Sequence, residues 1–231
     1  MASPVARLIA DPWTALSTLV EGPLHPGGAA ATESLLDRAG VASGTRLLDA
    51  GCGAGEAVAL ARERGATAFG VDHAPGTSHG IRGDLDRLPV ADDAFDAVLA
   101  ECALCLADDF PTAVRETRRV LAPDGRLALS DVAVENAVDV PDPVAEALCL
   151  TGTRDTETVL TTLRANGYRI VDRSDHGEAL LEMRDRIEAA VDYERLLRAT
   201  DEDELLDGIE RVERAVADDR IGYLSVIAEP V

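Results

Sequence analysis

Apolar and polar stretches alternate between residues 46 and 131 in a pattern that predicts strands and helices in turn. Short apolar runs bounded by Gly, Asp or Pro predict strands, and longer runs with one apolar side predict helices. The expected strands are 46–49, 67–71, a brief segment around Ile81, 96–100 and 126–131. The expected helices are 55–64 and 111–121, with a turn at 123–125. This alternation is typical of crossover connections and a mostly parallel sheet.

The flanking segments are more helical. Residues 1–40 are expected to form a helical lead-in, broken by His25-Pro26-Gly27-Gly28 and resumed as a helix over 29–38. Further on, the pattern predicts helices at 143–150 and 157–165, a strand at 169–173 and a closing strand at 221–228. Between the last two strands, residues 178–218 are expected to be an insertion of two acidic helices, 178–199 and 202–218. We expect residues 1–231 to form a single domain.

The composition suits a packed α/β domain with few aromatic side chains. Hydrophobic residues make up 46% of the chain and aromatic residues only 3%, so the core is expected to consist of Ala, Val, Leu and Ile. No run of about 18 apolar residues is present, and the N-terminal sequence shows no clear cleavage site. We therefore expect no transmembrane helix and a cytoplasmic protein.

The charge balance is strongly acidic. The chain has 43 acidic and 22 basic residues, all of the latter Arg, giving a net charge of −21. Such a surface repels nucleic acid, because phosphate binding needs clustered Lys and Arg, and it repels anionic membranes. The simplest interpretation is a solvated acidic shell, typical of halophilic proteins from a high-salt cytoplasm.

Three glycines follow the first predicted strand. Gly51, Gly53 and Gly55 let the chain turn tightly and let a ligand approach the backbone beyond the carboxyl end of the strand. A dinucleotide-binding turn has Gly or Ala where Glu56 stands, and Glu56 would repel a pyrophosphate. Asp49 adds negative charge just before the turn. The turn therefore favours a cationic ligand over one that carries phosphates.

Acidic side chains are also expected at the ends of the next three strands. Asp72 follows the second strand and suits the two hydroxyls of a ribose. Asp84 and Leu85 follow the third, where they suit the amino group and ring of adenine, and Glu101 ends the fourth. His73 lies either against the nucleoside or on the surface. Together these residues predict an adenosine site.

These segments resemble the class I S-adenosylmethionine-dependent methyltransferases. The residues that carry the resemblance are Leu47–Glu56, Gly70–Asp72, Gly83–Pro89, Asp92–Glu101 and Val120–Asp131. The resemblance implies a Rossmann-like, doubly wound, seven-stranded sheet of order 3-2-1-4-5-7-6, mostly parallel with an antiparallel last strand. It also implies S-adenosylmethionine as cofactor and S-adenosylhomocysteine as product. The short stretch between Asp72 and Asp84 implies a loop where the family has a helix.

A narrower resemblance is to the arsenite methyltransferases. The segment Glu101–Val132 is similar to theirs, and Cys102 and Cys149 fall on two positions that bind As(III) in that family. A third family cysteine, before the glycine-rich strand, has no counterpart in this sequence, nor does the family's large C-terminal extension.

The four cysteines are few and scattered, so no disulfide framework is expected. Cys102 and Cys105 form a Cys-x-x-Cys, and with Cys149 they are candidates to hold a soft metalloid or thiol acceptor, because thiolates bind soft ions. The alternative is that each is a small buried apolar residue. Cys52, inside the glycine turn, is expected to line the cofactor pocket or to be such a core residue. No resident metal is expected, since there is neither a second Cys-x-x-Cys nor a nearby His pair.

Several functions stay open at this point. The favoured one is methyl transfer to a small soluble acceptor, As(III) or a thiol near Cys102. The alternatives are a methyltransferase for an O, N or C acceptor, a noncatalytic S-adenosylmethionine-binding module, and a nicotinamide oxidoreductase, which Glu56 disfavours. A hydroxyl or amine acceptor needs a base, for which only Glu101 and His176 are candidates. The acidic helix pair either caps the site or forms the face of a homodimer.

Overall fold

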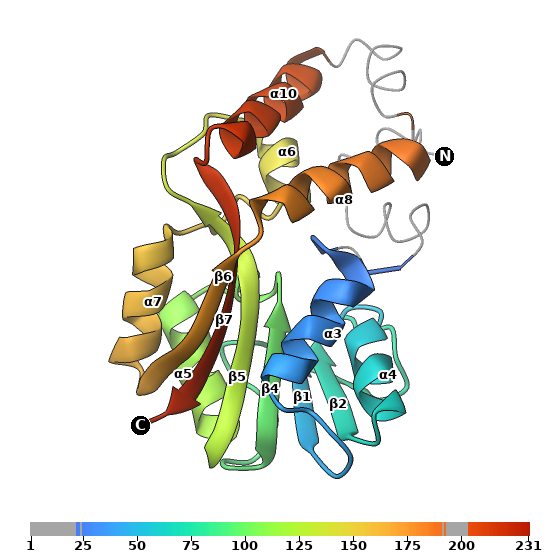
Figure 1. Cartoon of the computed structure of the whole chain (residues 1–231), viewed down its shortest axis with the longest axis vertical. Coiled ribbons are helices and arrows are strands. Elements are labelled where there is room, and N and C mark those ends of the chain that lie inside the picture. Colours follow the sequence, from blue (N-terminus) through green and yellow to red (C-terminus); the bar gives the residue numbers. More distant parts are fainter. Residues whose placement is uncertain (1–21, 24, 191, 193–202) are drawn as a thin grey trace.

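The computed structural model describes residues 22–23, 25–190, 192 and 203–231. Most of the lead-in expected before residue 25, and the segment joining the two acidic helices, lie outside the described residues. The described part of the chain is built around one twisted sheet with helices on both faces and beyond one edge (Figure 1).

Seven strands form the sheet in the described residues, in the order β3-β2-β1-β4-β5-β7-β6. They are β1 (Arg46–Ala50), β2 (Thr67–Asp72), β3 (Gly80–Arg82), β4 (Phe95–Glu101), β5 (Leu121–Val134), β6 (Tyr168–Asp175) and β7 (Ile221–Pro230). The strands from β3 to β5 pair in parallel, whereas β7 is antiparallel to both β5 and β6. The expected fold class and strand order are confirmed.

Helices cover the two faces of this sheet. On one face lie α3 (Gly28–Arg38) and α4 (Glu56–Glu63), and on the other α5 (Phe110–Val120) and α7 (Thr156–Ala165) (Figure 1). The helix α5 begins at the cap Asp109, whose side chain accepts from the Thr112 N–H, and has Pro111 in its first turn. The shorter expected link between β2 and β3 is confirmed, because residues 73–79 form turns and bends.

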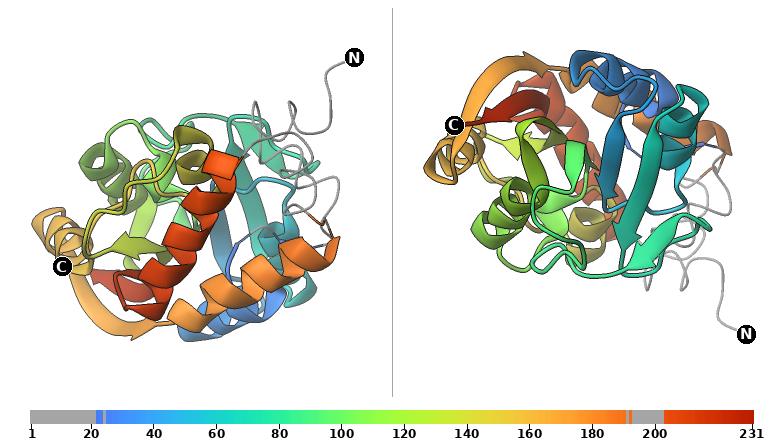
Figure 2. Two further views of the ribbon diagram at one scale, coloured as in Figure 1. Left: turned by 90° about the horizontal axis from the view of Figure 1, so that it is seen from above. Right: turned by 90° about the horizontal axis from the view of Figure 1, so that it is seen from below.

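In the described residues, three helices lie beyond the edge where the parallel strands end. They are α6 (Asp142–Ala147), α8 (Gly177–Ala190) and α10 (Asp203–Ala217), and a view from above shows α8 and α10 passing over that edge (Figure 2). The acidic helical insertion therefore contributes α8 and α10, and both contact β7.

Two local predictions were wrong. The turn expected at residues 123–125 is part of β5, because β5 begins at Leu121 and pairs with β4 through an irregularity between Phe95 and Ala97. The helix expected over 143–150 ends at Ala147, and the chain then passes through Cys149 with a left-handed φ of 56°.

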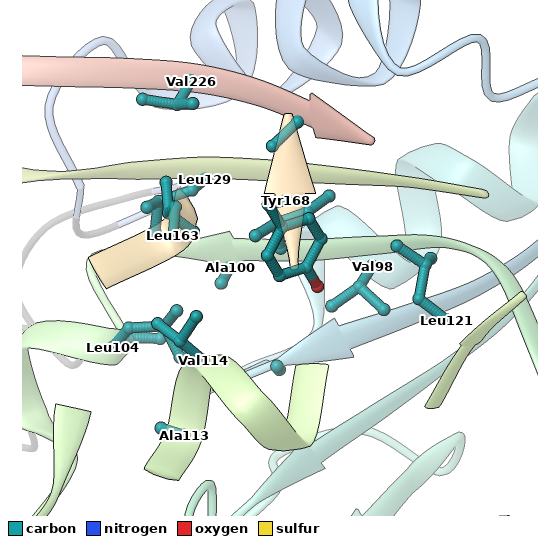
Figure 3. Close-up of a cluster of buried hydrophobic side chains, with 14 of the residues drawn as sticks. Val98, Ala100, Leu104, Ala113, Val114, Leu121, Leu129, Leu163, Tyr168 and Val226 are labelled. Atoms are coloured by element: carbon teal, nitrogen blue, oxygen red, sulfur yellow. The ribbon is translucent and has the colours of Figure 1, made fainter. Parts of the chain in front are cut away.

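The core consists of three apolar clusters. The first packs α5 and α7 on the sheet around Tyr168, whose hydroxyl lies 3.0 Å from the Thr117 hydroxyl (Figure 3). The second packs α3 and α4 on the opposite face. The third lies beyond the sheet edge and joins α6, α8 and α10 to the ends of β5 and β7. It includes Cys105 and Cys149, so the cap formed by these helices covers two of the candidate cysteines.

Candidate functional site

A pocket of about 200 Å³ opens at the carboxyl ends of the parallel strands. Its lining comes from the ends of β1, β2, β3 and β4 and from η1 (Leu104–Leu106) with the residues after it. The lining residues are Gly51, Asp72, His73, Gly83, Asp84, Leu85, Cys102, Ala103, Leu106, Ala107 and Asp108. Six of the residues expected from the sequence therefore meet there: Gly51, Asp72, His73, Asp84, Leu85 and Cys102.

The glycine-rich turn brings β1 close to β4. Gly51 has a φ of 89°, and a β-carbon on it would lie 2.3 Å from that of Ala103. Gly55 is the N-cap of α4 with a φ of 90°, and Thr77 of the 73–79 loop packs on it. Gly53, with a φ of 47°, has nothing within 4 Å of its virtual β-carbon, so the space on that side of the turn is open.

Asp72 at the end of β2 fixes the loops on either side of it. One carboxylate oxygen accepts from the Gly53 N–H at 2.9 Å and the other from the Ala74 N–H at 2.9 Å. An ionised carboxylate has about four acceptor sites, so both oxygens can still accept from a ligand. Asp72 thus links the glycine turn to the 73–79 loop and lines the pocket.

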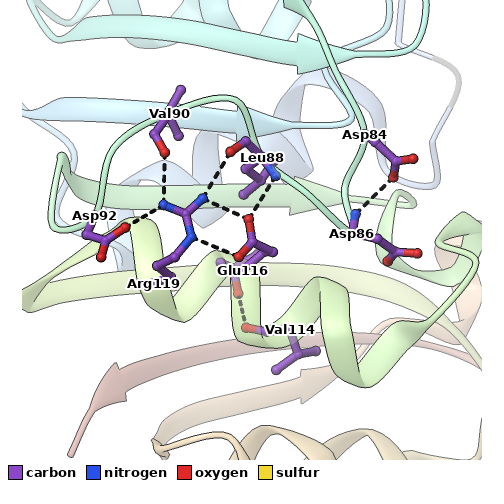
Figure 4. Close-up of polar contacts among 9 residues, drawn as sticks. Asp84, Asp86, Leu88, Val90, Asp92, Val114, Glu116 and Arg119 are labelled. Atoms are coloured by element: carbon purple, nitrogen blue, oxygen red, sulfur yellow. Dashed lines mark hydrogen bonds and ion pairs between the residues drawn. The ribbon is translucent and has the colours of Figure 1, made fainter.

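Asp84 and Leu85 form a turn that follows β3. The Asp84 carboxylate accepts from the Asp86 N–H at 2.9 Å, which is drawn in Figure 4, and its carbonyl accepts from the Arg87 N–H. Asp86 in turn accepts from the Asp109 N–H at 3.0 Å, next to the pocket residue Asp108. Of the described lining residues, none is Arg and three are Asp, so the pocket suits a ligand without phosphates.

Cys102 lies at the end of β4 in a strained backbone conformation. Its φ of 48° is left-handed, which is uncommon for a residue with a side chain and costs about 1–3 kcal/mol. Its N–H is bonded to the Ser130 carbonyl, and its thiol lies 3.8 Å from the Tyr223 hydroxyl, which donates to the Ser130 hydroxyl at 2.8 Å. β5 and β7 therefore hold Cys102 facing the pocket.

The three candidate cysteines meet in one cluster. Hydrogen bonding to Cys102 and Cys105, together with burial, raises the pKa of the Cys149 thiol. The bond to Cys149 lowers the pKa of Cys105, but burial and the nearby Asp131 and Cys102 raise it to about 12. Only Cys102 of the three lines the pocket. No group of three or more metal-ligating side chains among the described residues is arranged to hold a metal ion.

Asp131 binds the backbone next to the cysteine cluster. It is fully buried in β5, and its carboxylate accepts from the Cys105 N–H at 2.9 Å and the Val132 N–H at 3.1 Å. Burial raises the pKa of Asp131 to about 6, against the lowering effect of these bonds and of Arg154. The Arg154 guanidinium stacks 4.1 Å from the centre of the Phe110 ring. Asp131 thereby fixes the η1 segment that walls the pocket.

Asp49 and Glu101 lie outside the pocket lining, buried toward α3. Burial raises the pKa of Asp49, and the charges of Glu101, Asp72 and Glu56 raise it further. Burial also raises the pKa of Glu101, although His25 and the Thr32 hydroxyl lower it. The two strand-end carboxylates nearest the glycine turn thus form a buried acidic pair.

The structure separates some candidates from the pocket. Cys52 points into the core under α4, where a β-carbon on Gly70 would lie 2.3 Å from its sulfur, and burial raises its pKa to about 12. His176 lies 3.2 Å from the Ser225 hydroxyl, and it is not among the pocket residues. Sequence reasoning missed Asp108, Thr32 and His25, because only the tertiary packing brings their segments to this edge of the sheet.

The family comparison matches residues 48–129, from β1 to β5, to the methyltransferase domain family. Residues 48–129, less than half of the chain, are therefore similar to a methyltransferase domain. The resemblance found in the sequence is confirmed at this level. The methyltransferase domain contains the glycine turn and most of the pocket lining, and the helices of the cap lie outside it. In the described residues, no helix has the length and apolar character needed to cross a membrane.

Two curated relatives are methyltransferases, and one of them is named for an arsenite acceptor. The chain is 36% identical over 149 residues to the methyltransferase GfsG of Streptomyces halstedii, covering 57% of this chain and 54% of that protein. It is 31% identical over 163 residues to the arsenite methyltransferase of Halobacterium salinarum, covering 61% and 41%. The match spans about half the length of these curated relatives or less, so it supports the methyltransferase family and not one acceptor.

Solved structures share the fold. The [4+2]-cyclase SpnF aligns with a TM-score of 0.72 and 23% identity, covering 97% of this chain and 93% of its own. Phosphoethanolamine N-methyltransferase 2 of Haemonchus contortus, in complex with S-adenosyl-L-methionine, aligns with a TM-score of 0.71 and 21% identity, covering 100% and 60%. At these identities the likeness shows the methyltransferase fold alone.

Proposed function

We propose that this protein transfers the methyl group of S-adenosylmethionine to a small acceptor. The observation that carries the proposal is the pocket at the ends of β1, β2, β3 and β4, with three aspartates and no arginine in its described lining. S-adenosylmethionine has no phosphate and carries a sulfonium and an ammonium, which suit acidic surroundings. When bound, it supplies a methyl group open to in-line attack.

The pocket residues fit the adenosine part of this cofactor. Asp72 is suited to accept from both ribose hydroxyls and Asp84 from the adenine amino group, while Leu85 and Leu106 offer apolar surface to the ring. The open space at Gly53 allows close approach beside the turn. Holding donor and acceptor in line is the main contribution such a site makes, and it can lower the barrier by about 7–11 kcal/mol.

The clustered cysteines support a soft acceptor such as As(III). Arsenous acid, As(OH)₃, condenses with thiols by forming As–S bonds and releasing one water per thiol, so protonated thiols are competent partners. Cys105 and Cys149 are buried in the apolar cluster beneath the cap, and Cys102 packs against that cluster. As(III) entry would therefore begin at Cys102, which lines the pocket.

Calorimetry and a transfer assay test the proposal. We expect tight binding of S-adenosylmethionine and S-adenosylhomocysteine, no binding of NAD, and transfer of labelled methyl to As(III) or a small thiol. Cys102→Ser is expected to weaken As(III) binding at least about tenfold, whereas the core variant Cys52→Ala leaves it unchanged. If the As(III) affinity is unchanged in Cys102→Ser, the hypothesis of a soft acceptor is wrong. Methyl transfer to a hydroxyl or amine acceptor then becomes the favoured function.

A reaction without methyl transfer is the second candidate. The pocket suits the cofactor, and the same fit would serve a protein that binds S-adenosylmethionine without transferring its methyl group. Tight S-adenosylmethionine binding with no labelled product from any thiol, metalloid, hydroxyl or amine would support this candidate over methyl transfer.

Asp72→Asn tests the adenosine site. The amide can accept on one atom only, so it loses either a loop contact or a ribose contact. We expect S-adenosylhomocysteine affinity to fall about 10- to 100-fold by titration calorimetry. The exposed Asp124→Asn in β5 removes the same charge and serves as the control. An unchanged affinity in Asp72→Asn would contradict the assignment.

A further inference from the structure

A buried tyrosine hydroxyl lies behind the thiol that lines the pocket. Tyr223 of β7 is 2% exposed, and its hydroxyl oxygen lies 3.8 Å from the sulfur of Cys102, whose thiol is the donor. The Tyr223 hydroxyl itself donates to the Ser130 hydroxyl of β5 at 2.8 Å. Of these three residues, only Cys102 lines the pocket. A chain of hydrogen bonds therefore runs from the pocket into the interior of the sheet.

Strand pairing fixes both ends of the contact between Cys102 and Tyr223. The Cys102 N–H donates to the Ser130 carbonyl at 2.8 Å, directly after Glu101 pairs with Ser130. Tyr223 pairs with Val132 where β7 runs antiparallel to β5. The Tyr223 side chain is packed in the third apolar cluster, together with residues of the cap helices. The hydroxyl is therefore held in place by the sheet and the core, and not by a loop.

The Tyr223 hydroxyl is suited to hydrogen bonding and not to proton transfer. Burial raises its pKa well above the ordinary value, and the nearby Cys102 and Glu101 raise it further, so the hydroxyl stays protonated. A neutral tyrosine hydroxyl has one proton to donate and an oxygen that accepts. In this structure the proton is given to Ser130, and the oxygen accepts from the Cys102 thiol. Tyr223 can thus orient the thiol without reacting itself.

We propose that Tyr223 is a positioning residue that holds the Cys102 sulfur toward the pocket for bonding to a soft electrophile. The inference deepens the proposed function, because it rests on Cys102 as the residue that meets a soft acceptor. As the sulfur loses its proton to solvent and attacks, negative charge develops on it. The Tyr223 hydroxyl then turns from Ser130 and donates to the sulfur. Hydrogen bonds to charged groups are stronger than those between neutral groups, so this exchange favours the reaction.

Raman spectroscopy tests the contact through the S–H stretching band of Cys102, which is assigned by its loss in Cys102→Ser. We expect Tyr223→Phe to shift this band to higher frequency, because the thiol loses its acceptor. Tyr168→Phe is the matched control, since Tyr168 is also fully buried and its hydroxyl lies 3.0 Å from that of Thr117 in another apolar cluster (Figure 3). This control should leave the band in place. An unshifted band in Tyr223→Phe would overturn the proposal.

Alkylation of the whole protein by iodoacetamide tests reactivity and needs neither cofactor nor As(III). A C–S bond forms, the C–I bond breaks, iodide leaves and the thiol proton goes to the buffer. We expect the rate at Cys102, measured by mass spectrometry, to fall about fivefold or more in Tyr223→Phe and to stay unchanged in Tyr168→Phe. Ser130→Ala removes the competing acceptor, so the rate should rise about twofold or more.

The direction of these changes separates positioning from a structural role. Truncating a merely structural residue loosens the packing and exposes the thiol, so an unchanged or faster rate in Tyr223→Phe would overturn the proposal. A slower rate in Ser130→Ala would also overturn it. The proposed function fails separately: if the wild-type protein does not bind As(III) while alkylation of Cys102 still depends on Tyr223, the soft acceptor is wrong and the positioning role stands.

Discussion

At the scale of single residues, glycine is required at position 51 for two separate reasons. Its φ of 89° lies in the left-handed region, and its missing β-carbon lets Ala103 pack against the turn. Gly44 has nearly the same φ, 88°, yet nothing lies within 4 Å of its virtual β-carbon. Comparing Gly44 with Gly51 therefore separates the cost of the left-handed backbone from the cost of steric contact with Ala103.

Replacing each glycine by alanine separates the two effects. Gly44→Ala is expected to lower the free energy of unfolding by about 1–2 kcal/mol, the cost of the left-handed backbone. Gly51→Ala should cost about 1–3 kcal/mol more, because the new methyl group overlaps Ala103. Urea denaturation measures both. Equal losses in the two variants would mean that the Ala103 contact adjusts without cost.

Asp131 predicts a pH dependence of stability. Its folded pKa of about 6 exceeds the ordinary 3.8, so the folded protein holds this proton more tightly than the unfolded chain. The resulting stabilisation is full below pH 4 and is lost as the pH rises through about 6, a difference of about 2–3 kcal/mol. We expect Asp131→Asn to remove this part of the slope in urea titrations between pH 4.5 and 7.5. Asp124→Asn, an exposed control, should retain it.

The sequence predicts the strand-end residues better than the rest of the site. Asp72, Asp84 and Cys102 meet in the pocket because parallel strands end at one edge, which is a property of the fold class. Cys52 differs, since the left-handed backbone around it turns its thiol toward Gly70. His25 was seen in the sequence only as part of a helix breaker, because nothing local places it beside Glu101.

At the scale of elements, α5 is tied to the chain that leads from the pocket into β4. Arg119 donates to the carbonyls of Leu88 and Val90 and to the carboxylates of Asp92 and Glu116 (Figure 4). The guanidinium fits this arrangement because it presents several donors in one plane. These bonds fix the segment that follows Asp84 and Leu85, so α5 supports one wall of the pocket.

Arg119→Ala is expected to destabilise this connection. The side chain is 29% exposed, so we expect a loss of about 1–2 kcal/mol in unfolding free energy rather than that of a fully buried pair. Arg115 lies on the same helix and donates to Thr112 one turn earlier, so Arg115→Ala is the matched control and should cost less than 0.5 kcal/mol. Similar melting temperatures for the two variants would contradict the supporting role of Arg119.

The observed boundaries of helices and strands match the expected ones where the apolar periodicity and the capping residue agree. The helix α7 runs from Thr156 to Ala165 with Asp155 as its N-cap, close to its expected range of 157–165. The boundaries failed where the strand register is irregular. Pro123-Asp124-Gly125 suggests a turn, yet these residues belong to β5 and lie between its paired residues Leu121 and Arg126, where the register with β4 shifts.

At the scale of the whole molecule, charge sets the conditions for stability. A net charge of −21 on 231 residues causes self-repulsion in the compact state. Ion pairs such as Arg126–Glu229 and Arg38–Asp172 offset part of it, but acidic residues outnumber basic ones by about two to one. The halophilic character expected from the sequence can therefore be tested by measuring how the stability of the protein depends on salt concentration.

We predict that the melting temperature rises by about 5 °C or more between dilute buffer and 2 M KCl, with much of the change below 0.5 M, where the Debye length falls below about 5 Å. A homodimer face, one of the two roles that the sequence leaves open for the acidic helices, stays a prediction, and sedimentation at both salt concentrations would test it. An unchanged melting temperature would contradict the proposed role of repulsion.

The place of β7 in the sheet has a consequence for biosynthesis. β7 follows β6 in the chain, yet it lies between β5 and β6 and pairs with both. While the protein is being translated, β6 leaves the ribosome before the strand that joins it to the rest of the sheet. Until residues 221–230 emerge, β6 has unpaired edges, which are prone to associate with other chains. Nascent chains arrested before β7 should therefore depend on chaperones more than released ones.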